Sequence, residues 1–196
     1  MPRGSSKAVH EKERKLISVI DLSDGSEGEI AEKVIAQLKV NGILRLRNHG
    51  VPAAAIANAF EVAKVFFSQT AEEKNAAISK DRARRGYSPL SSENFASLVG
   101  EQMKNDSVEK FRIGPNSVGD DEYYSTKMGR VHFSPNIWPR NVEGMQTVME
   151  TYYLAMEKFV FHLMGIIERG LKVERDYFRG KLFRHTSILG LNYFPP

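Results

Sequence analysis

The chain has 196 residues, of which 41% are hydrophobic and 10% aromatic, a composition typical of a globular domain. The net charge of +4 comes mostly from residues 1–15, where five Lys or Arg side chains outnumber two Glu, so the remainder lacks the basic face of a nucleic-acid-binding protein. The absence of cysteine excludes disulfides, thiolate metal sites and cysteine nucleophiles.

The first predicted elements are a strand and a helix. Residues 1–16 form a basic tail that we expect to be flexible, and the β-prone run 17–22 follows it. Ser26 and Glu29 have the spacing of a capping box, and apolar residues then recur at helical spacing as far as Gly42. The sequence therefore predicts a helix with both ends marked.

A second strand and helix follow directly. Residues 43–47 alternate between apolar and polar as a strand does, and Pro52 stands where the first turn of a helix accepts proline. We expect this helix to extend to about residue 68. From there to residue 140 regular patterns fade, apart from a polar helical piece over residues 71–79, and a region this long usually carries function.

The last third of the chain has the clearest pattern. Apolar residues recur every three or four positions between residues 142 and 169, which predicts a long amphipathic helix that stops at Gly170. The run 187–194 predicts a final strand. The most apolar stretch, residues 159–167, is too short and too polar to cross a bilayer, and no secretory signal precedes the first strand. We expect a cytoplasmic protein with no membrane or nucleic-acid partner.

Seven short motifs stand along this order of elements. They are Val19-Ile-Asp-Leu22, the segment Gly42 to Gly50 ending in Asn-His-Gly, Phe66-Phe67 with Glu73-Lys74, Gly86-Tyr87, Glu109-Lys-Phe-Arg-Ile-Gly114, Trp138-Pro139, and Asn192-Tyr-Phe-Pro-Pro196. In this order they resemble the N-terminal half of the non-haem iron(II), 2-oxoglutarate-dependent dioxygenases related to isopenicillin N synthase. Each motif alone is common, and the resemblance depends on their shared order.

The resemblance implies an α+β fold. Residues 17–196 would be the helical and flanking-strand N-terminal portion of a double-stranded β-helix, or jelly-roll, oxygenase that ends at the first barrel strand, with most of the barrel missing. It also implies iron(II) and 2-oxoglutarate as cofactors and a small molecule as substrate. In such enzymes two His and one carboxylate hold the iron, which leaves positions open for 2-oxoglutarate and dioxygen.

The iron ligands that the resemblance implies are missing from this sequence. The family supplies two of them as His-x-Asp or His-x-Glu, but the residues two positions beyond the five histidines are Lys12, Val51, Ser134, Met164 and Ser187. His132 and His185 also lack a carboxylate at useful spacing. We therefore predict that this chain contains no catalytic or metal-binding residue and binds neither cofactor tightly alone.

The resemblance also indicates candidate binding residues. Tyr87 is predicted to bind substrate, because the Gly-Tyr loop of the family can reach the mouth of the site. Arg85, in a cluster with Arg82 and Arg84, is predicted to bind an anionic group of the substrate, because a guanidinium pairs well with a carboxylate. Solvated charge is the alternative for the arginines. Asn192 and Phe194 are predicted to lie at the 2-oxoglutarate site.

Phe194 departs from the family pattern. It stands where the family has the second tyrosine of Asn-Tyr-Tyr, whose hydroxyl commonly helps to bind a carboxylate of 2-oxoglutarate. Phenylalanine lacks this hydroxyl, so three alternatives stay open: Phe194 weakens the cosubstrate site, Phe194 only packs, or the protein does not use 2-oxoglutarate.

Two functions remain open from the sequence. The chain is predicted to be the substrate-shaping, N-terminal portion of an iron(II)- and 2-oxoglutarate-dependent oxidoreductase that is inactive alone. The alternative is a stand-alone truncated relative that acts as a protein-interaction module. In either case, the long helix and the final strand would expose apolar surface and an unpaired edge, so we expect self-association.

Overall fold

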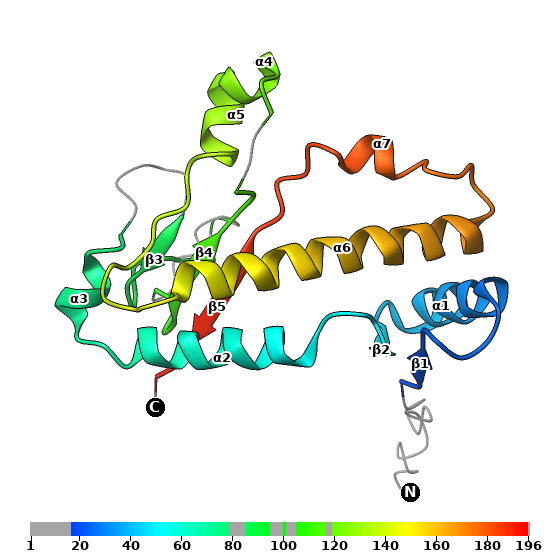
Figure 1. The fold of residues 1–196 in the computed structure, drawn as a ribbon, viewed down its shortest axis with the longest axis horizontal. Coiled ribbons are helices and arrows are strands. Elements are labelled where there is room, and N and C mark those ends of the chain that lie inside the picture. Colours follow the sequence, from blue (N-terminus) through cyan, green and yellow to red (C-terminus); the bar gives the residue numbers. More distant parts are fainter. Residues whose placement is uncertain (1–16, 79–84, 95–99, 101–104, 117–118, 196) are drawn as a thin grey trace, which may run out of the picture. The chain divides into compact units, whose positions relative to one another are not determined.

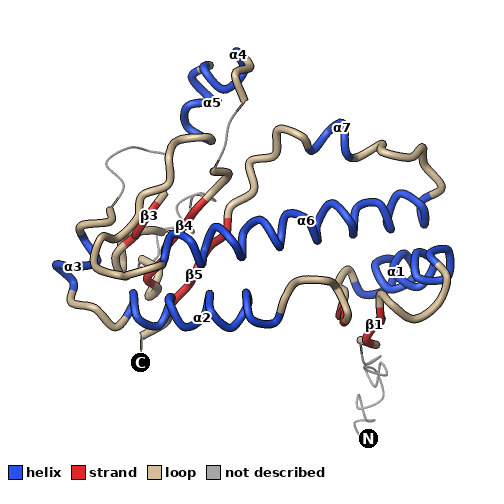
Figure 2. The backbone as a smooth tube through the Cα atoms, viewed as in Figure 1, coloured by secondary structure: helices blue, strands red, loops and turns tan. Residues whose placement is uncertain are grey.

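The structure is a computed structural model that describes residues 17–78, 85–94, 100, 105–116 and 119–195 (Figure 1). The predicted tail over residues 1–16 lies outside the described residues. Contacts divide the chain into two compact units, one of Met1–His49 with Leu163–Tyr177 and the other of Gly50–His162 with Phe178–Pro196. Figure 2 shows the helices and strands of both units. The fold class is α+β, as predicted.

The first unit contains a parallel pair of short strands. Strand β1 (Val19–Asp21) pairs with β2 (Arg45–Arg47), and helix α1 (Glu27–Asn41) connects them. Both hydrogen bonds of the predicted capping box between Ser26 and Glu29 are present, and Gly42 ends the helix in the left-handed conformation, at φ 65°. These findings confirm the elements predicted before residue 48.

Two of the sequence motifs meet at Asp21. The Asp21 carboxylate accepts hydrogen bonds from the Ser23 backbone N–H, at 2.9 Å, and from Nδ2 of Asn48, at 2.9 and 3.0 Å. Nε of Arg47 donates to the same carboxylate at 2.7 Å. These hydrogen bonds hold the pKa of Asp21 well below its usual range, and the bond from the Ser23 backbone N–H has the largest effect. Asp21 therefore ties the end of β1 to the residues that follow β2.

The second unit is built around an antiparallel sheet of three strands in the order β3-β4-β5. The strands are β3 (Gly86–Ser88), β4 (Glu109–Ile113) and β5 (Leu189–Tyr193). Its helices are α2 (Ala53–Phe67), α3 (Ala71–Asn75), α4 (Glu122–Ser125), α5 (Lys127–His132), α7 (Arg179–Leu182) and the first part of α6 (Met145–Leu171), whose end belongs to the first unit. Among the described residues, no helix is long and apolar enough to span a membrane.

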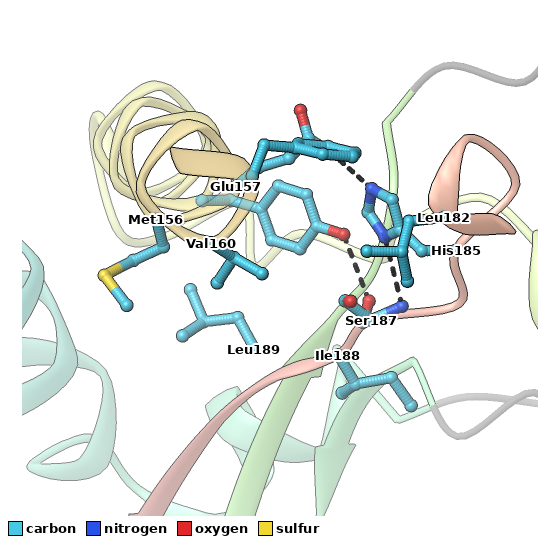
Figure 3. Close-up of a pocket in the computed structure, with 10 residues that line it drawn as sticks. Met156, Glu157, Val160, Leu182, His185, Ser187, Ile188 and Leu189 are labelled. Carbon is cyan, nitrogen blue, oxygen red and sulfur yellow. Dashed lines mark hydrogen bonds and ion pairs between the residues drawn. The ribbon is translucent and has the colours of Figure 1, made fainter. Parts of the chain in front are cut away.

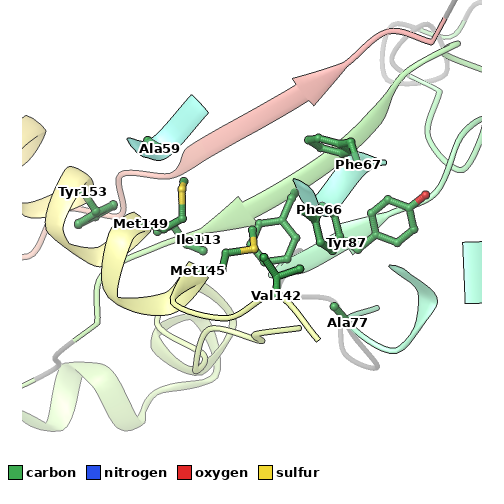
Figure 4. Packing of buried hydrophobic residues seen from close by; sticks show 11 residues of the cluster. Ala59, Phe66, Phe67, Ala77, Tyr87, Ile113, Val142, Met145, Met149 and Tyr153 are labelled. Atoms are coloured by element: carbon green, nitrogen blue, oxygen red, sulfur yellow. The ribbon is translucent and has the colours of Figure 1, made fainter. Parts of the chain in front are cut away.

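The core of the second unit lies where α2 and α6 meet one face of this sheet (Figure 4). Phe66 is fully buried, and its ring makes edge-on contacts with the rings of Phe111 and Tyr87, at centroid distances of 4.9 and 5.5 Å. Met145 and Met149 fill the space on the α6 side. The apolar stripe of the predicted long helix is thus core in this unit.

Candidate functional site

Three of the sequence motifs meet in one buried ionic cluster, formed by Lys74, Tyr87 and Glu109. Nζ of Lys74 lies 2.7 Å from Oε2 of Glu109, and the Tyr87 hydroxyl donates to the same oxygen at 2.6 Å. All three residues are buried. Burial, together with the bond to Glu109 and the charge of Glu109, raises the pKa of Tyr87, so its hydroxyl stays protonated and remains a donor.

Gly86 makes the position of Tyr87 possible. Its backbone has φ 78°, and a Cβ at this position would overlap with the carbonyl oxygen of Ala77. Tyr87 N–H donates to that same carbonyl at 2.9 Å. A side chain at position 86 would therefore break the contact that brings the Tyr87 ring into the core, which explains the Gly-Tyr motif physically.

The structure places Arg85 in the interior of the second unit. Its exposed fraction is 2%, Nη2 donates to the carbonyl oxygen of His132 at 2.5 Å, and a Cβ at Gly114 would overlap with the guanidinium. Arg82 and Arg84 lie outside the described residues. The substrate-binding roles of Arg85 and Tyr87 stay predictions, and in this structure both side chains bind within the chain.

A second ionic cluster lies on the opposite face of β4, because side chains alternate along a strand. Glu93 accepts two hydrogen bonds from Arg112, at 2.6 and 2.7 Å, and one from Nζ of Lys110 at 2.8 Å. The bond from Arg112, followed by that from Lys110, lowers the pKa of Glu93 to about 2. Sequence reasoning missed this cluster, although the polar-apolar alternation of residues 110–113 was a usable signal.

Asn192 and Phe194 stand at the end of β5. Asn192 is exposed and lies opposite Lys110 in the sheet register, and the ring of Phe194 is 70% exposed. Between them, the Tyr193 ring stacks on Phe67 with centroids 5.1 Å apart. The cofactor-binding roles of Asn192 and Phe194 stay predictions. Phe194 is also not packed into the core of the described residues.

A pocket of about 210 Å³ lies between α6 and the segment from α7 to β5 (Figure 3). Apolar side chains form most of its wall. Nε2 of His185 lies 2.8 Å from Oε1 of Glu157, and the Tyr153 hydroxyl donates to the Ser187 carbonyl oxygen at 3.1 Å. His185 therefore has a carboxylate partner that spacing along the sequence did not reveal.

The described side chains do not fit the iron that the resemblance implies. Among the described residues, no three His, Asp or Glu side chains come close enough together to hold a metal ion. The pocket near His185 contributes one imidazole and one carboxylate, which is one ligand fewer than the set of the family requires. We therefore assign no chemical step to this chain alone.

Comparison with known proteins identifies the family. Residues 17–141 match the family model of the N-terminal region of non-haem dioxygenases, described as "non-haem dioxygenase in morphine synthesis N-terminal". Because this match covers more than half of the chain, the chain belongs to this family.

Curated relatives agree with this assignment. Flavanone 3-dioxygenase 2 of Oryza sativa subsp. japonica is 26% identical over 180 residues, which cover 91% of this chain and 47% of that protein. The 2-oxoglutarate-Fe(II) type oxidoreductase ppzD of Metarhizium majus is 27% identical over 179 residues, which cover 87% of this chain and 51% of that protein. The chain spans about half the length of the curated relatives it matches.

Solved structures show the same fold. A 2OG-Fe(II) oxygenase family protein from Caulobacter crescentus superposes with a TM-score of 0.77 at 22% identity, over 92% of this chain and 56% of that one. A full-length protein of Neurospora crassa, solved in complex with alpha-KG, superposes with a TM-score of 0.72 at 21% identity, over 91% of this chain and 54% of that one. The expected relation to oxygenases with 2-oxoglutarate and iron(II) as cofactors is thus confirmed at the level of the family.

Proposed function

We propose that residues 17–196 are the N-terminal, substrate-shaping portion of an iron(II)- and 2-oxoglutarate-dependent oxidoreductase that acts on a small molecule in the cytoplasm. The family match over residues 17–141 carries this proposal. The buried cluster of Lys74, Tyr87 and Glu109 supports it, because three motifs of the family resemblance build one contact there. Most of the barrel and the iron ligands would come from sequence outside these 196 residues.

The contribution of the chain would be to position one sheet. The ion pair between Lys74 and Glu109 ties α3 to β4, and the Tyr87 hydroxyl ties β3 to the same carboxylate. We propose that Tyr87 and Arg85 shape the substrate site from these fixed positions. At the far edge of the sheet, the end of β5 would present Asn192 and Phe194 to 2-oxoglutarate.

Reading the transcript past the codon for Pro196 tests this proposal. The expected result is an in-frame continuation that encodes His-x-Asp or His-x-Glu and a second histidine far downstream, which together complete the iron ligands. A well-supported stop codon directly after Pro196 would contradict the proposal. It would favour a stand-alone interaction module instead.

A further inference from the structure

The three-stranded sheet of the second unit has one apolar face and one polar face. Phe111, Ile113 and Leu191 pack toward the core, so the residues that alternate with them lie on the other face. On that face the strands carry only polar side chains or glycine, namely Gly86, Ser88, Lys110, Arg112, Gly190 and Asn192. Such a face is suited to a polar ligand and not to a second hydrophobic layer.

Arg112 is held in a fixed orientation on the central strand of this polar face. Nη1 and Nη2 of its guanidinium donate to the two carboxylate oxygens of Glu93, at 2.6 and 2.7 Å. Nη1 also donates to the Ser88 hydroxyl at 3.1 Å. Only 12% of the Arg112 side chain is exposed, so these contacts fix the direction of the guanidinium.

One edge of the Arg112 guanidinium is not used within the described residues. A guanidinium has five N–H donors, of which two go here to Glu93 and one to Ser88. The other two, on Nε and Nη2, lie side by side on one edge. Nε makes no hydrogen bond to the described residues, and it is not sealed from solvent. Two parallel N–H groups on one edge match the two oxygens of a carboxylate.

The position opposite Arg112 leaves room for a ligand. Gly190 is the register partner of Arg112 on β5, and a Cβ at Gly190 would meet no other described residue within 4 Å. Ser88 holds the guanidinium from β3, which lies on the other side of β4 (Figure 1). The edge away from Ser88 is therefore the one on the side of Gly190.

The charges around Arg112 favour an anionic group. Lys110 and Arg112 bring two positive charges to the single carboxylate of Glu93. Asp106 is a second carboxylate near Lys110, but it lies 3.6 Å away and is more exposed than Glu93, so solvent weakens its contribution. The cluster can therefore accept one further negative charge.

We propose that the unused edge of Arg112 binds a carboxylate of the substrate. This inference rests on the proposed function, in which Asn192 lies at the 2-oxoglutarate site. The pair of Arg112 and Gly190 stands two residues from the pair of Lys110 and Asn192, or about 7 Å along the strands. A carboxylate bound to Arg112 would therefore lie beside the cosubstrate and not in its place.

The side-chain Nε–H signal of Arg112 in the NMR spectrum of the isotope-labelled 196-residue chain reports this binding directly. Benzoate is the probe, and benzamide is its uncharged counterpart of nearly the same shape. We expect benzoate to shift the Arg112 signal in a saturable way, and benzamide to bind at least about tenfold more weakly, because it offers one oxygen and no charge. A signal that neither compound moves, or that both move alike, would overturn the proposal.

A lysine variant separates the planar edge from the charge. Arg112→Lys keeps a positive charge that can pair with Glu93, but an ammonium has no edge for two parallel hydrogen bonds. We expect it to bind benzoate at least about tenfold more weakly, measured on the backbone amides of β4 and β5. Arg140→Lys, at an exposed arginine, is the matched control and should bind as the natural chain does. Equal affinity of Arg112→Lys and the natural chain would overturn the proposal.

A variant at Gly190 tests the place of the site without changing Arg112. Gly190→Val fills the open position, and a β-branched residue is well suited to a strand, so the variant should fold. We expect the Arg112 signal to persist and its response to benzoate to be lost. An undiminished response would overturn the site beside Gly190.

This experiment measures binding and needs neither iron nor sequence beyond Pro196. If benzoate does not bind while the transcript continues in frame, this inference fails and the proposed function stands. If benzoate binds but a stop codon follows Pro196, the proposed function fails, and the assignment of this carboxylate site to a substrate fails with it.

Discussion

Oε2 of Glu109 accepts hydrogen bonds from two residues that come from different motifs, Lys74 and Tyr87. A buried carboxylate is stable only when its partners compensate for the loss of water, so each of the two bonds contributes to keeping Glu109 inside the unit. Their distances of 2.7 and 2.6 Å are those of charge-assisted hydrogen bonds.

Removal of the Tyr87 hydroxyl should therefore destabilise the fold. We expect Tyr87→Phe to lower the free energy of unfolding by roughly 1.5 to 3 kcal/mol, the range for a hydrogen bond to a charged group. Urea unfolding followed by circular dichroism measures this change. Tyr124→Phe is the matched control, since the Tyr124 hydroxyl makes no hydrogen bond to the described residues, and this variant should change stability by less than about 0.5 kcal/mol. Equal effects of the two variants would contradict the assigned role of Tyr87.

Glu93 should make stability depend on pH in the acid range. Its pKa is about 2 in the folded chain, below the ordinary value of 4.5, so its bonds to Arg112 and Lys110 stabilise the fold above about pH 4.5. As pH falls from 4.5 towards 2, the unfolded chain takes up a proton before the folded chain does, and this stabilisation of roughly 2 to 3 kcal/mol is lost.

The variant Glu93→Gln isolates this contribution from those of other carboxylates. We expect it to unfold at lower urea concentration than the natural chain at pH 7, and the difference between the two proteins should shrink as pH approaches 2. A difference that stays constant across this pH range would show that the charge of Glu93 does not stabilise the fold.

At the scale of the elements, the strand β3 depends on one glycine. We expect Gly86→Ala to cost about 1 to 3 kcal/mol or more, because alanine is strained at φ 78° and its Cβ would overlap with the Ala77 carbonyl oxygen. Thermal unfolding measures the cost. Gly165→Ala, in an open position of helix α6, is the control and should stabilise the protein by up to about 1 kcal/mol. A Gly86→Ala variant as stable as the natural chain would contradict the close contact between β3 and Ala77.

Elements with local signals could be predicted from the sequence. Helix α1 shows its capping box and its terminal glycine, and α6 shows a long apolar stripe, so the predicted ranges end within a few residues of the observed ones. Strand β3 could not be predicted as an element, because its three residues show no pattern, and the alternation in β4 covers only residues 110–113. These strands form because they pair with each other and with β5, and their own composition does not indicate that pairing.

The candidate site could be predicted only in part, for the same reason. The motifs contain Lys74, Tyr87 and Glu109, but Tyr87 reaches Glu109 across 22 positions through the pairing of β3 with β4. Lys74 reaches Glu109 across 35 positions because α3 lies beside β4. The pair of His185 and Glu157 was missed because helix α6 and the segment before β5 bring these residues together across 28 positions. Residues that fold into contact over such distances leave no local pattern.

At the scale of the whole molecule, the chain is expected to supply structure while sequence outside it supplies the iron ligands. The described side chains build and position a sheet of the family, but no three of them form a set of iron ligands. Iron loading without oxygen, followed by addition of 2-oxoglutarate and dioxygen, therefore tests the central claim directly on the 196-residue chain.

The measurement is the iron content per chain together with the succinate released. We predict iron well below one equivalent per chain after buffer exchange, and no succinate above that of free iron(II) at the same concentration. One tightly bound iron per chain, with succinate formed in proportion to protein, would show that these 196 residues hold a complete catalytic site and would contradict the account.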